Sequence, residues 1–182
     1  MITKIKIMKR FAAFTIVLLL AGCAILQKPT AVDLKPMPVS EFLDKPFGHD
    51  ESIESFQSTL PIGTKVQKLI RRSGYKHHKP DTIYNFKYKK SKIAVYKTQF
   101  NQEFLLGGFV NNPEIEMVNG IRKGMEREKF YKAFTDLELT LNDSVVLNHP
   151  QRERRFSFYF DKRGRLEKFY FSGSSTKKIG SD

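Results

Sequence analysis

Tryptophan is absent from this chain, and cysteine occurs once, at position 23. A single cysteine excludes an intrachain disulfide and leaves no set of thiolates for a structural zinc site. The fold must therefore be stabilised by packing alone. Phenylalanine and tyrosine supply the 13% aromatic content, within 40% hydrophobic residues. Aromatic side chains suit a pleated, half-buried surface, so this composition favours β-rich packing around a core.

Catalytic motifs are also missing. The sequence has no Gly-x-Ser-x-Gly elbow, no His-Glu-x-x-His pair and no phosphate-binding glycine loop. Among the histidines, His49, His77, His78 and His149, the adjacent pair would point to opposite sides of a strand, which does not suit metal binding. We therefore expect no metal, no cofactor and no enzymatic activity. A hydrolase with a dispersed site is the alternative that one sequence leaves open.

The apolar run at residues 11–20 is too short to span a bilayer, which takes about 20 apolar residues. It follows a basic start and precedes small residues, which is the pattern of a secretory signal. Leu20, Ala21, Gly22 and Cys23 resemble the lipobox of bacterial lipoproteins. That resemblance implies cleavage before Cys23, with residues 1–22 as signal peptide, and acylation of Cys23 as the membrane anchor. Ala24, rather than aspartate, implies the outer membrane, with the domain on its periplasmic side.

The formal net charge is +13, and four of the positive charges lie in the first ten residues. The surplus that remains favours anionic partners: lipopolysaccharide, anionic lipid or an acidic envelope protein. Because the chain is expected to be secreted, nucleic acid is the poorest candidate partner, and we expect no nucleic-acid binding. Two basic clusters are the candidate anion- or partner-binding residues. The first is Arg71, Arg72, Lys76, Lys79, Lys87, Lys89, Lys90 and Lys92, and the second is Arg152, Arg154, Arg155, Lys162, Arg163 and Arg165.

Residues 23–46 contain four prolines and little apolar periodicity, which predicts an extended tether after the lipidated cysteine. Two later stretches read alike. Residues 60–74 and residues 120–134 each predict an amphipathic helix, and Gly63 aligns with Gly124. The apolar stripe of the second helix is Met125, Phe130, Ala133 and Phe134.

Each predicted helix is followed by a hairpin signal. Residues 83–88 and 93–98 flank a lysine-rich turn, and residues 156–160 and 166–171 flank a turn that contains Gly164. Residues 104–110 could add a strand, with the Gly107–Gly108 pair marking a bulge or a turn. The predicted fold is α+β: two tandem helix-plus-β-hairpin units, residues 47–110 and 111–172, packed as one small antiparallel-sheet domain. Residues 173–182 are expected to be a disordered tail.

The segment Gly124-Met125-x-x-Glu128, its helix, and the later Phe-Tyr-Phe-Asp-x-x-Gly-x-Leu-Glu-Lys at residues 158–168 resemble the BamE/SmpA type of small outer-membrane lipoprotein domain. The tandem arrangement is similar to the β-lactamase-inhibitor-protein fold. The resemblance implies a non-catalytic binding or scaffolding role at the outer membrane. Two alternatives stay open: an inhibitor or accessory protein of a periplasmic enzyme, favoured by exposed aromatics such as Tyr159 or Tyr170, and a binder of lipopolysaccharide or anionic lipid.

Overall fold

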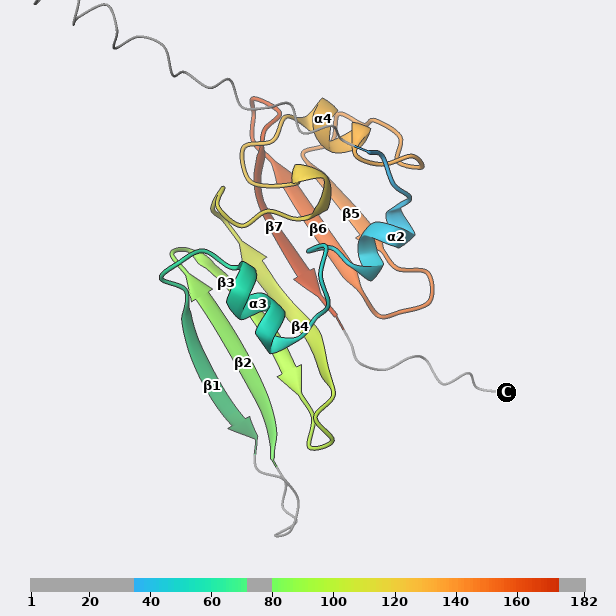
Figure 1. Ribbon diagram of the computed structural model, residues 1–182. Coiled ribbons are helices and arrows are strands. Elements are labelled where there is room, and N and C mark those ends of the chain that lie inside the picture. The colour runs from blue at the N-terminus through green and yellow to red at the C-terminus, as the bar shows by residue number, and fades with distance from the viewer. Residues whose placement is uncertain (1–34, 72–79, 174–182) are drawn as a thin grey trace, which may run out of the picture. The chain divides into compact units, whose positions relative to one another are not determined.

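The centre of the fold is an antiparallel sheet (Figure 1), in a computed structural model that describes residues 35–71 and 80–173. The strands are β1 (Lys65–Arg71), β2 (Asp81–Tyr88), β3 (Ser91–Lys97), β4 (Glu103–Val110), β5 (Ser144–Asn148), β6 (Arg155–Phe160) and β7 (Leu166–Ser172). They form one seven-stranded sheet in the order β1-β2-β3-β4-β7-β6-β5. All neighbours follow each other in the chain except β4 and β7, whose pairing joins the two halves of the sheet.

Two tight turns set the hairpins that the sequence predicted. Lys89 adopts a left-handed backbone (φ 47°) between β2 and β3, and Gly164 does so (φ 68°) between β6 and β7. In the second turn, the Asp161 carboxylate accepts hydrogen bonds from the main-chain N–H groups of Arg163 and Arg165 at 2.8 and 2.9 Å. The four strands predicted around these turns are confirmed within two residues.

The predicted strand at residues 104–110 is also confirmed, as β4, and its glycine pair lies beside a bulge. The register between β3 and β4 shifts at Ala94, where Gly107 pairs with Ala94 and Leu105 pairs with Val95. A Cβ on Gly108 would lie 2.4 Å from the Phe171 ring and 2.5 Å from the Lys92 carbonyl oxygen. Glycine at position 108 therefore lets the Phe171 ring pack directly on the β4 backbone.

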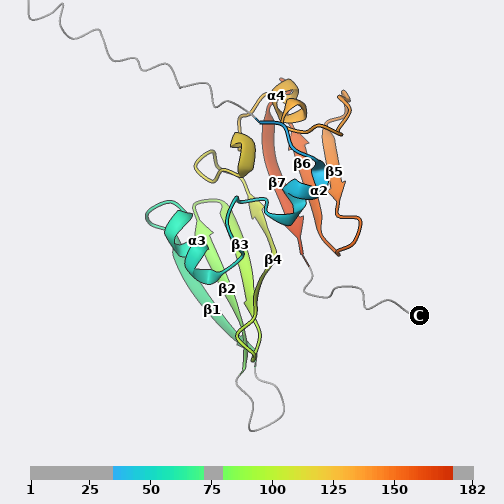
Figure 2. The same ribbon diagram turned by 45° about the vertical axis from the view of Figure 1, so that its right-hand side comes forward.

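The helices are short (Figure 2), and their buried side chains belong to one hydrophobic core. They are α2 (Val39–Asp44), α3 (Ile53–Thr59), the 3₁₀ turn η1 (Val118–Gly120) and α4 (Arg127–Lys132). Phe42 of α2 and Phe130 of α4 are fully buried, and Phe56 of α3 is 1% exposed. Their rings meet strand phenylalanines, as in the pairs Phe42–Phe156 at 5.6 Å and Phe56–Phe86 at 5.8 Å between ring centroids. One face of the sheet is therefore packed against helices through aromatic contacts.

The predicted fold class, two tandem helix-plus-hairpin units, is wrong. The chain forms a single seven-stranded sheet in which the N-terminal half contributes four consecutive strands and the C-terminal half contributes three. Units of one helix and one hairpin, divided at residues 47–110 and 111–172, lack the two edge strands β1 and β5. The physical reason is that strand pairing across β4 and β7 continues the sheet, which buries more apolar surface than two separate hairpins would.

The helix predicted at residues 60–74 does not form where the structure describes the chain. Gly63 has φ 92°, and both the N–H and the hydroxyl of Thr64 hydrogen-bond to the Pro61 carbonyl oxygen, at 3.1 and 2.7 Å. Thr64 thus closes a β-turn instead of capping a helix. Residues Lys65–Arg71 continue as β1, paired with β2 over seven residues. Residues 72–79 lie outside the described part.

The helix predicted at residues 120–134 is confirmed only in its second half, as α4. Gly124 (φ 92°) and Met125 instead pair with the start of β7: the Gly124 N–H donates to the Leu166 carbonyl at 2.7 Å, and the Leu166 N–H donates to the Met125 carbonyl at 2.8 Å. The predicted stripe is buried as expected at Phe130, Ala133 and Phe134. The helix therefore begins only at Arg127, because the residues before it pair with the sheet through their backbone.

The tether predicted over residues 23–46 is too long at its C-terminal end. Met37 forms a parallel bridge with Phe134, and Phe42 and Leu43 of α2 are fully buried. Proline does not prevent this helix, because Pro38 occupies the N-cap position of α2, where no intrahelical N–H is required. The folded part thus includes residues 37–46. The predicted signal peptide, Cys23 and the predicted tail fall in residues 1–34 and 174–182, which lie outside the described residues.

Candidate binding surface

Side-chain alternation gives the sheet two different faces. On β2 and β3, Phe86, Ile93 and Val95 point to the helix-covered face and are buried, whereas Lys87 and Lys92 point to the other face and are exposed. We call this second face the open face, because the buried phenylalanines of α2, α3 and α4 all contact strand phenylalanines of the first face.

Three lysines lie side by side on the open face. Lys65 of β1 pairs directly with Lys87 of β2, and Lys87 pairs directly with Lys92 of β3. We call these the lysine row. Directly opposite residues on antiparallel strands have Cβ atoms ~5 Å apart, and like charges so placed repel each other. No carboxylate of the described residues forms a salt bridge with any of the three. The row is therefore a concentration of positive charge without a neutralising partner in the described part of the chain.

An aromatic cluster continues the same line of residues across the sheet. Phe109 of β4 pairs with Lys92, and Tyr170 of β7 pairs with Phe109. The Phe109 and Tyr170 rings stack at 4.7 Å, and Tyr159 of β6 meets Tyr170 edge-on at 5.7 Å. Tyr170 is 42% exposed and Tyr159 is 37% exposed. Phe109, Tyr159 and Tyr170, the aromatic cluster, thus offer a partly exposed, rigid surface beside the lysine row.

The first predicted basic cluster is only partly brought together. Lys87 lies in the lysine row, whereas Arg71 lies at the opposite end of β1 from Lys65. Lys89 and Lys90 lie in the β2–β3 turn, where Lys89 forms an ion pair with Glu114, and this contact raises the pKa of Lys89 and lowers that of Glu114. Arg72, Lys76 and Lys79 lie outside the described residues. Lys92, the last member of that cluster, belongs to the lysine row.

In the second predicted cluster, Arg154 is not available to a ligand. Its side chain is 6% exposed, lies 2.6 Å from the Glu51 carboxylate, and donates to the carbonyl oxygens of Leu43 and Asp44 at 2.7 and 3.2 Å. The second Glu51 carboxylate oxygen accepts from the Leu105 N–H at 2.9 Å. Arg154 therefore fastens the C-terminal end of α2 to the sheet, which is a structural role.

The other arginines of that cluster are separated along β6. Arg152 lies 3.0 Å from Asp44, before the strand, and Arg155 begins the strand on the open face. Arg163 and Arg165 lie at the turn after the strand, and Arg165 approaches Glu126 at 3.6 Å. Five residue steps along a strand are ~17 Å, so these groups do not form one site. Of the arginines in this second cluster, only Arg155 lies on a strand of the open face.

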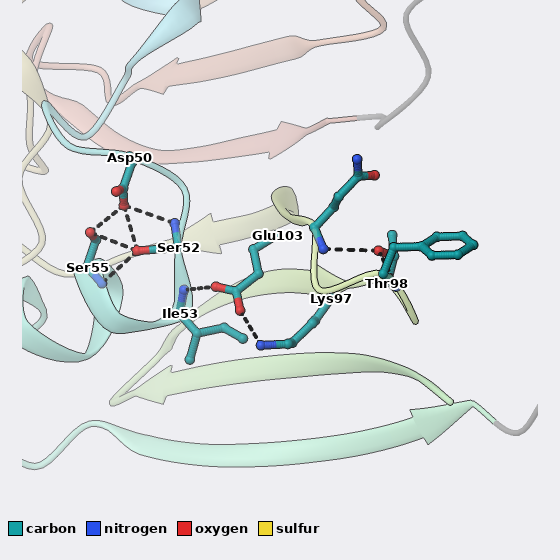
Figure 3. A network of polar contacts seen from close by, with 9 residues as sticks. Asp50, Ser52, Ile53, Ser55, Lys97, Thr98 and Glu103 are labelled. Atoms are coloured by element: carbon teal, nitrogen blue, oxygen red, sulfur yellow. Dashed lines mark hydrogen bonds and ion pairs between the residues drawn. The ribbon is translucent and has the colours of Figure 1, made fainter. Parts of the chain in front are cut away.

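A polar network holds the start of α3 (Figure 3). The Asp50 carboxylate accepts hydrogen bonds from the Ser52 hydroxyl at 2.6 Å and from the Ser55 hydroxyl. These contacts, the Ser52 bond first, lower the pKa of Asp50 to about 2. Glu103 accepts from the Ile53 N–H at 2.8 Å and from Lys97 at 2.7 Å. Carboxylates at a helix N-terminus satisfy its first N–H groups and complement its dipole.

A small pocket is lined in part by Phe56 and Thr59 of α3. It has a volume of about 90 Å³ and is lined by Phe47, His49, Phe56, Thr59, Leu60, Pro61, Glu114, Ile115 and Glu116. The His49 ring is stacked with Phe47 and meets Phe56 edge-on, at 6.2 and 4.8 Å between ring centroids. Within residues 35–71 and 80–173, no three histidine or acidic side chains gather as metal ligands would.

Sequence reasoning missed Lys65 and Phe109 as surface residues. Lys65 was placed in a helix, although the short alternation of Lys65, Val66 and Gln67 was a strand signal. The row of three lysines needs cross-strand registers that no single segment contains, so no local pattern could have revealed it.

Comparison with protein-family models, curated proteins and solved structures finds no match for this chain. Of the helices in the described residues, none has the length and apolar character needed to cross a membrane.

Proposed function

We propose that this protein is a lipid-anchored, non-catalytic binding module of the bacterial envelope. The lipobox at residues 20–23 supports an anchor on Cys23, and Ala24 supports the periplasmic face of the outer membrane. The resemblance of residues 124–128 and 158–168 to BamE/SmpA-like domains supports a scaffolding role beside other envelope proteins.

The aromatic cluster is the observation that carries this proposal. Tyrosine and phenylalanine anchors beside a polar rim are typical of protein-binding hot spots. The rings of Phe109, Tyr159 and Tyr170 already pack against one another before any partner arrives, which limits the entropy lost on binding. The partner that fits is an envelope protein, and an enzyme held in an inhibitory or accessory complex is one form it could take.

The test is a crosslink and affinity pull-down of the natively lipidated protein from its own envelope. We expect discrete proteins to be retained, and Tyr170→Ala to reduce their recovery at least tenfold, because such anchors contribute ~2 kcal/mol or more. Phe100→Ala is the matched control, since Phe100 is 75% exposed in the turn between β3 and β4, away from the cluster. Cys23→Ala tests the anchor separately. Equal losses for Tyr170→Ala and Phe100→Ala would contradict docking through the aromatic cluster.

The lysine row favours a second candidate function, binding of lipopolysaccharide or anionic lipid. Three neighbouring ammonium groups attract phosphates in a salt-dependent way. Co-sedimentation with anionic and with zwitterionic vesicles compares the two candidates. For lipid binding, Lys87→Gln would release the protein from anionic vesicles, and Tyr170→Ala would leave it bound. Equal retention of Lys87→Gln and the parent protein would remove this candidate.

A further inference from the structure

The two edge strands of the sheet differ in how far their apolar side chains are buried. At one edge, β5 buries Val145 and Leu147 on the helix-covered face, at 8% and 3% exposure. At the other edge, every residue of β1 is exposed. Val66 and Ile70, which share the helix-covered side with Phe86, are 40% and 59% exposed. The helix packing thus ends at β2 and leaves the apolar side chains of β1 without cover in the described part of the chain.

An edge of this kind is suited to receive another strand. On its far side from β2, β1 pairs with no strand of the described residues, so the outward-facing backbone N–H and C=O groups of β1 can accept one. A strand added there would also cover Val66 and Ile70 on one side of the sheet and Leu69, which is 53% exposed, on the other. Backbone bonds and apolar contacts would therefore favour the same addition.

Charge decides which strand fits. Lys65, Lys68 and Arg71 lie in β1, which contains no acidic residue. In a symmetric antiparallel pair of two copies, Lys68 would face Lys68 and Lys65 would face Arg71. No other register of two β1 strands forms an ion pair either. Like charges placed directly opposite are destabilising, so the edge opposes a second copy of this chain and favours a strand of negative charge.

We propose that β1 binds an extended, acidic segment of a partner protein as an additional antiparallel strand of the sheet. Antiparallel pairing is the more stable arrangement per residue. The segment has apolar residues opposite Val66, Leu69 and Ile70, and acidic residues opposite Lys65, Lys68 and Arg71. This surface is the sheet edge and is distinct from the aromatic cluster, so it holds or fails independently of the proposed function.

The probe is a blocked peptide with the core Glu-Val-Val-Glu-Thr-Val-Glu, whose antiparallel register provides that pattern. It is titrated into the lipidated full chain in detergent, and amide hydrogen exchange is followed along the sheet. We expect saturating peptide to slow exchange at alternate β1 amides at least tenfold and to leave β5 amides unchanged. The same peptide with lysine in place of glutamate is the charge control, and a scrambled peptide is the register control.

Substitutions test whether the peptide binds at the β1 edge. Val66→Glu with Ile70→Glu should weaken peptide binding at least tenfold, because it removes the apolar contacts and repels the glutamates of the peptide; Val146→Glu on β5, at a residue 41% exposed, is the matched control. Tyr170→Ala should leave peptide binding unchanged, which separates this site from the aromatic cluster. Unchanged β1 exchange at millimolar peptide would overturn the proposal, and so would equal binding of the lysine peptide. The exchange measurement on the chain without substitutions tests the proposal even where a variant folds poorly.

Discussion

Replacing the middle residue of the lysine row should make the protein more stable. Lys87 faces Lys65 on one side and Lys92 on the other, so Lys87→Thr removes two direct like-charge contacts. Each such cross-strand contact costs ~0.2–1 kcal/mol relative to a neutral pair. All three lysines are exposed, so solvent screening keeps the sum near the lower end. We expect the free energy of unfolding to rise by ~0.5–1 kcal/mol at low ionic strength.

The salt dependence of that gain tests its cause. The Debye length is ~30 Å at 0.01 M and ~3 Å at 1 M salt, so most of the electrostatic gain should disappear at high salt. The assay is urea unfolding at both salt concentrations, read as a shift in midpoint with an unchanged m-value. Lys87→Arg is the control that keeps the charge and should give no gain.

One result would refute the reasoning. A stabilisation by Lys87→Thr of the same size at 0.01 M and 1 M salt would come from the higher strand preference of threonine and not from relieved repulsion. The lysine row would then carry no electrostatic strain.

Three further predictions concern the frame of the fold, and urea unfolding measures each. Arg154→Met should destabilise the protein by ~3 kcal/mol, because it leaves the Glu51 carboxylate half-buried without its cation; replacing Glu51 by glutamine as well should restore part of the loss, and an additive loss would contradict the pairing. The pKa of Asp50 is lowered, so its stabilising contribution is complete above pH ~4 and is lost as the pH falls towards 2. Asp50→Asn should therefore make the free energy of unfolding depend less on pH between these values. An unchanged pH dependence would contradict this assignment. Gly108→Ala should cost ~1–3 kcal/mol, because its Cβ meets the Phe171 ring and a main-chain oxygen that cannot move aside; a neutral effect would show that the bulge relaxes freely.

Strands and turns with local signals could be predicted from the sequence. The β2–β3 and β6–β7 hairpins have alternating side chains on both sides of a turn, and Gly164 has the positive φ expected of it. Phe130, Ala133 and Phe134 are buried as their helical spacing predicted.

The errors arose where two conformations share one local pattern. Gly63 and Gly124 were aligned as equivalent, and both do have φ 92°, but a strand follows the first and a helix follows the second. The choice depends on the neighbouring segment: β2 pairs with residues 65–71, whereas no strand pairs with α4. Tertiary pairing of this kind overrides local propensity.

The candidate surface was the least predictable part. The sequence indicated Lys87, Lys92, Tyr159 and Tyr170, but not Lys65 and Phe109, nor which of these residues face one another, because register is a property of pairs of strands. Arg154 is an error of the opposite kind. The sequence predicts it as part of a binding surface, but its side chain is buried and pairs with Glu51.

The pairing of β4 with β7 has a consequence for the time course of folding. Its register joins residues 59 to 65 positions apart, from the pair Val110–Phe169 to the pair Gly107–Ser172, whereas the other strand pairs are hairpins between consecutive strands. The strand nearest the C-terminus therefore lies between β4 and β6, and each of those two strands is an open edge until it arrives. A chain delivered N-terminus first cannot close its sheet until residues 166–172 have emerged. Closing such a distant pair is entropically slow, so the nascent chain passes through a stage with exposed strand edges in which protection from aggregation matters most.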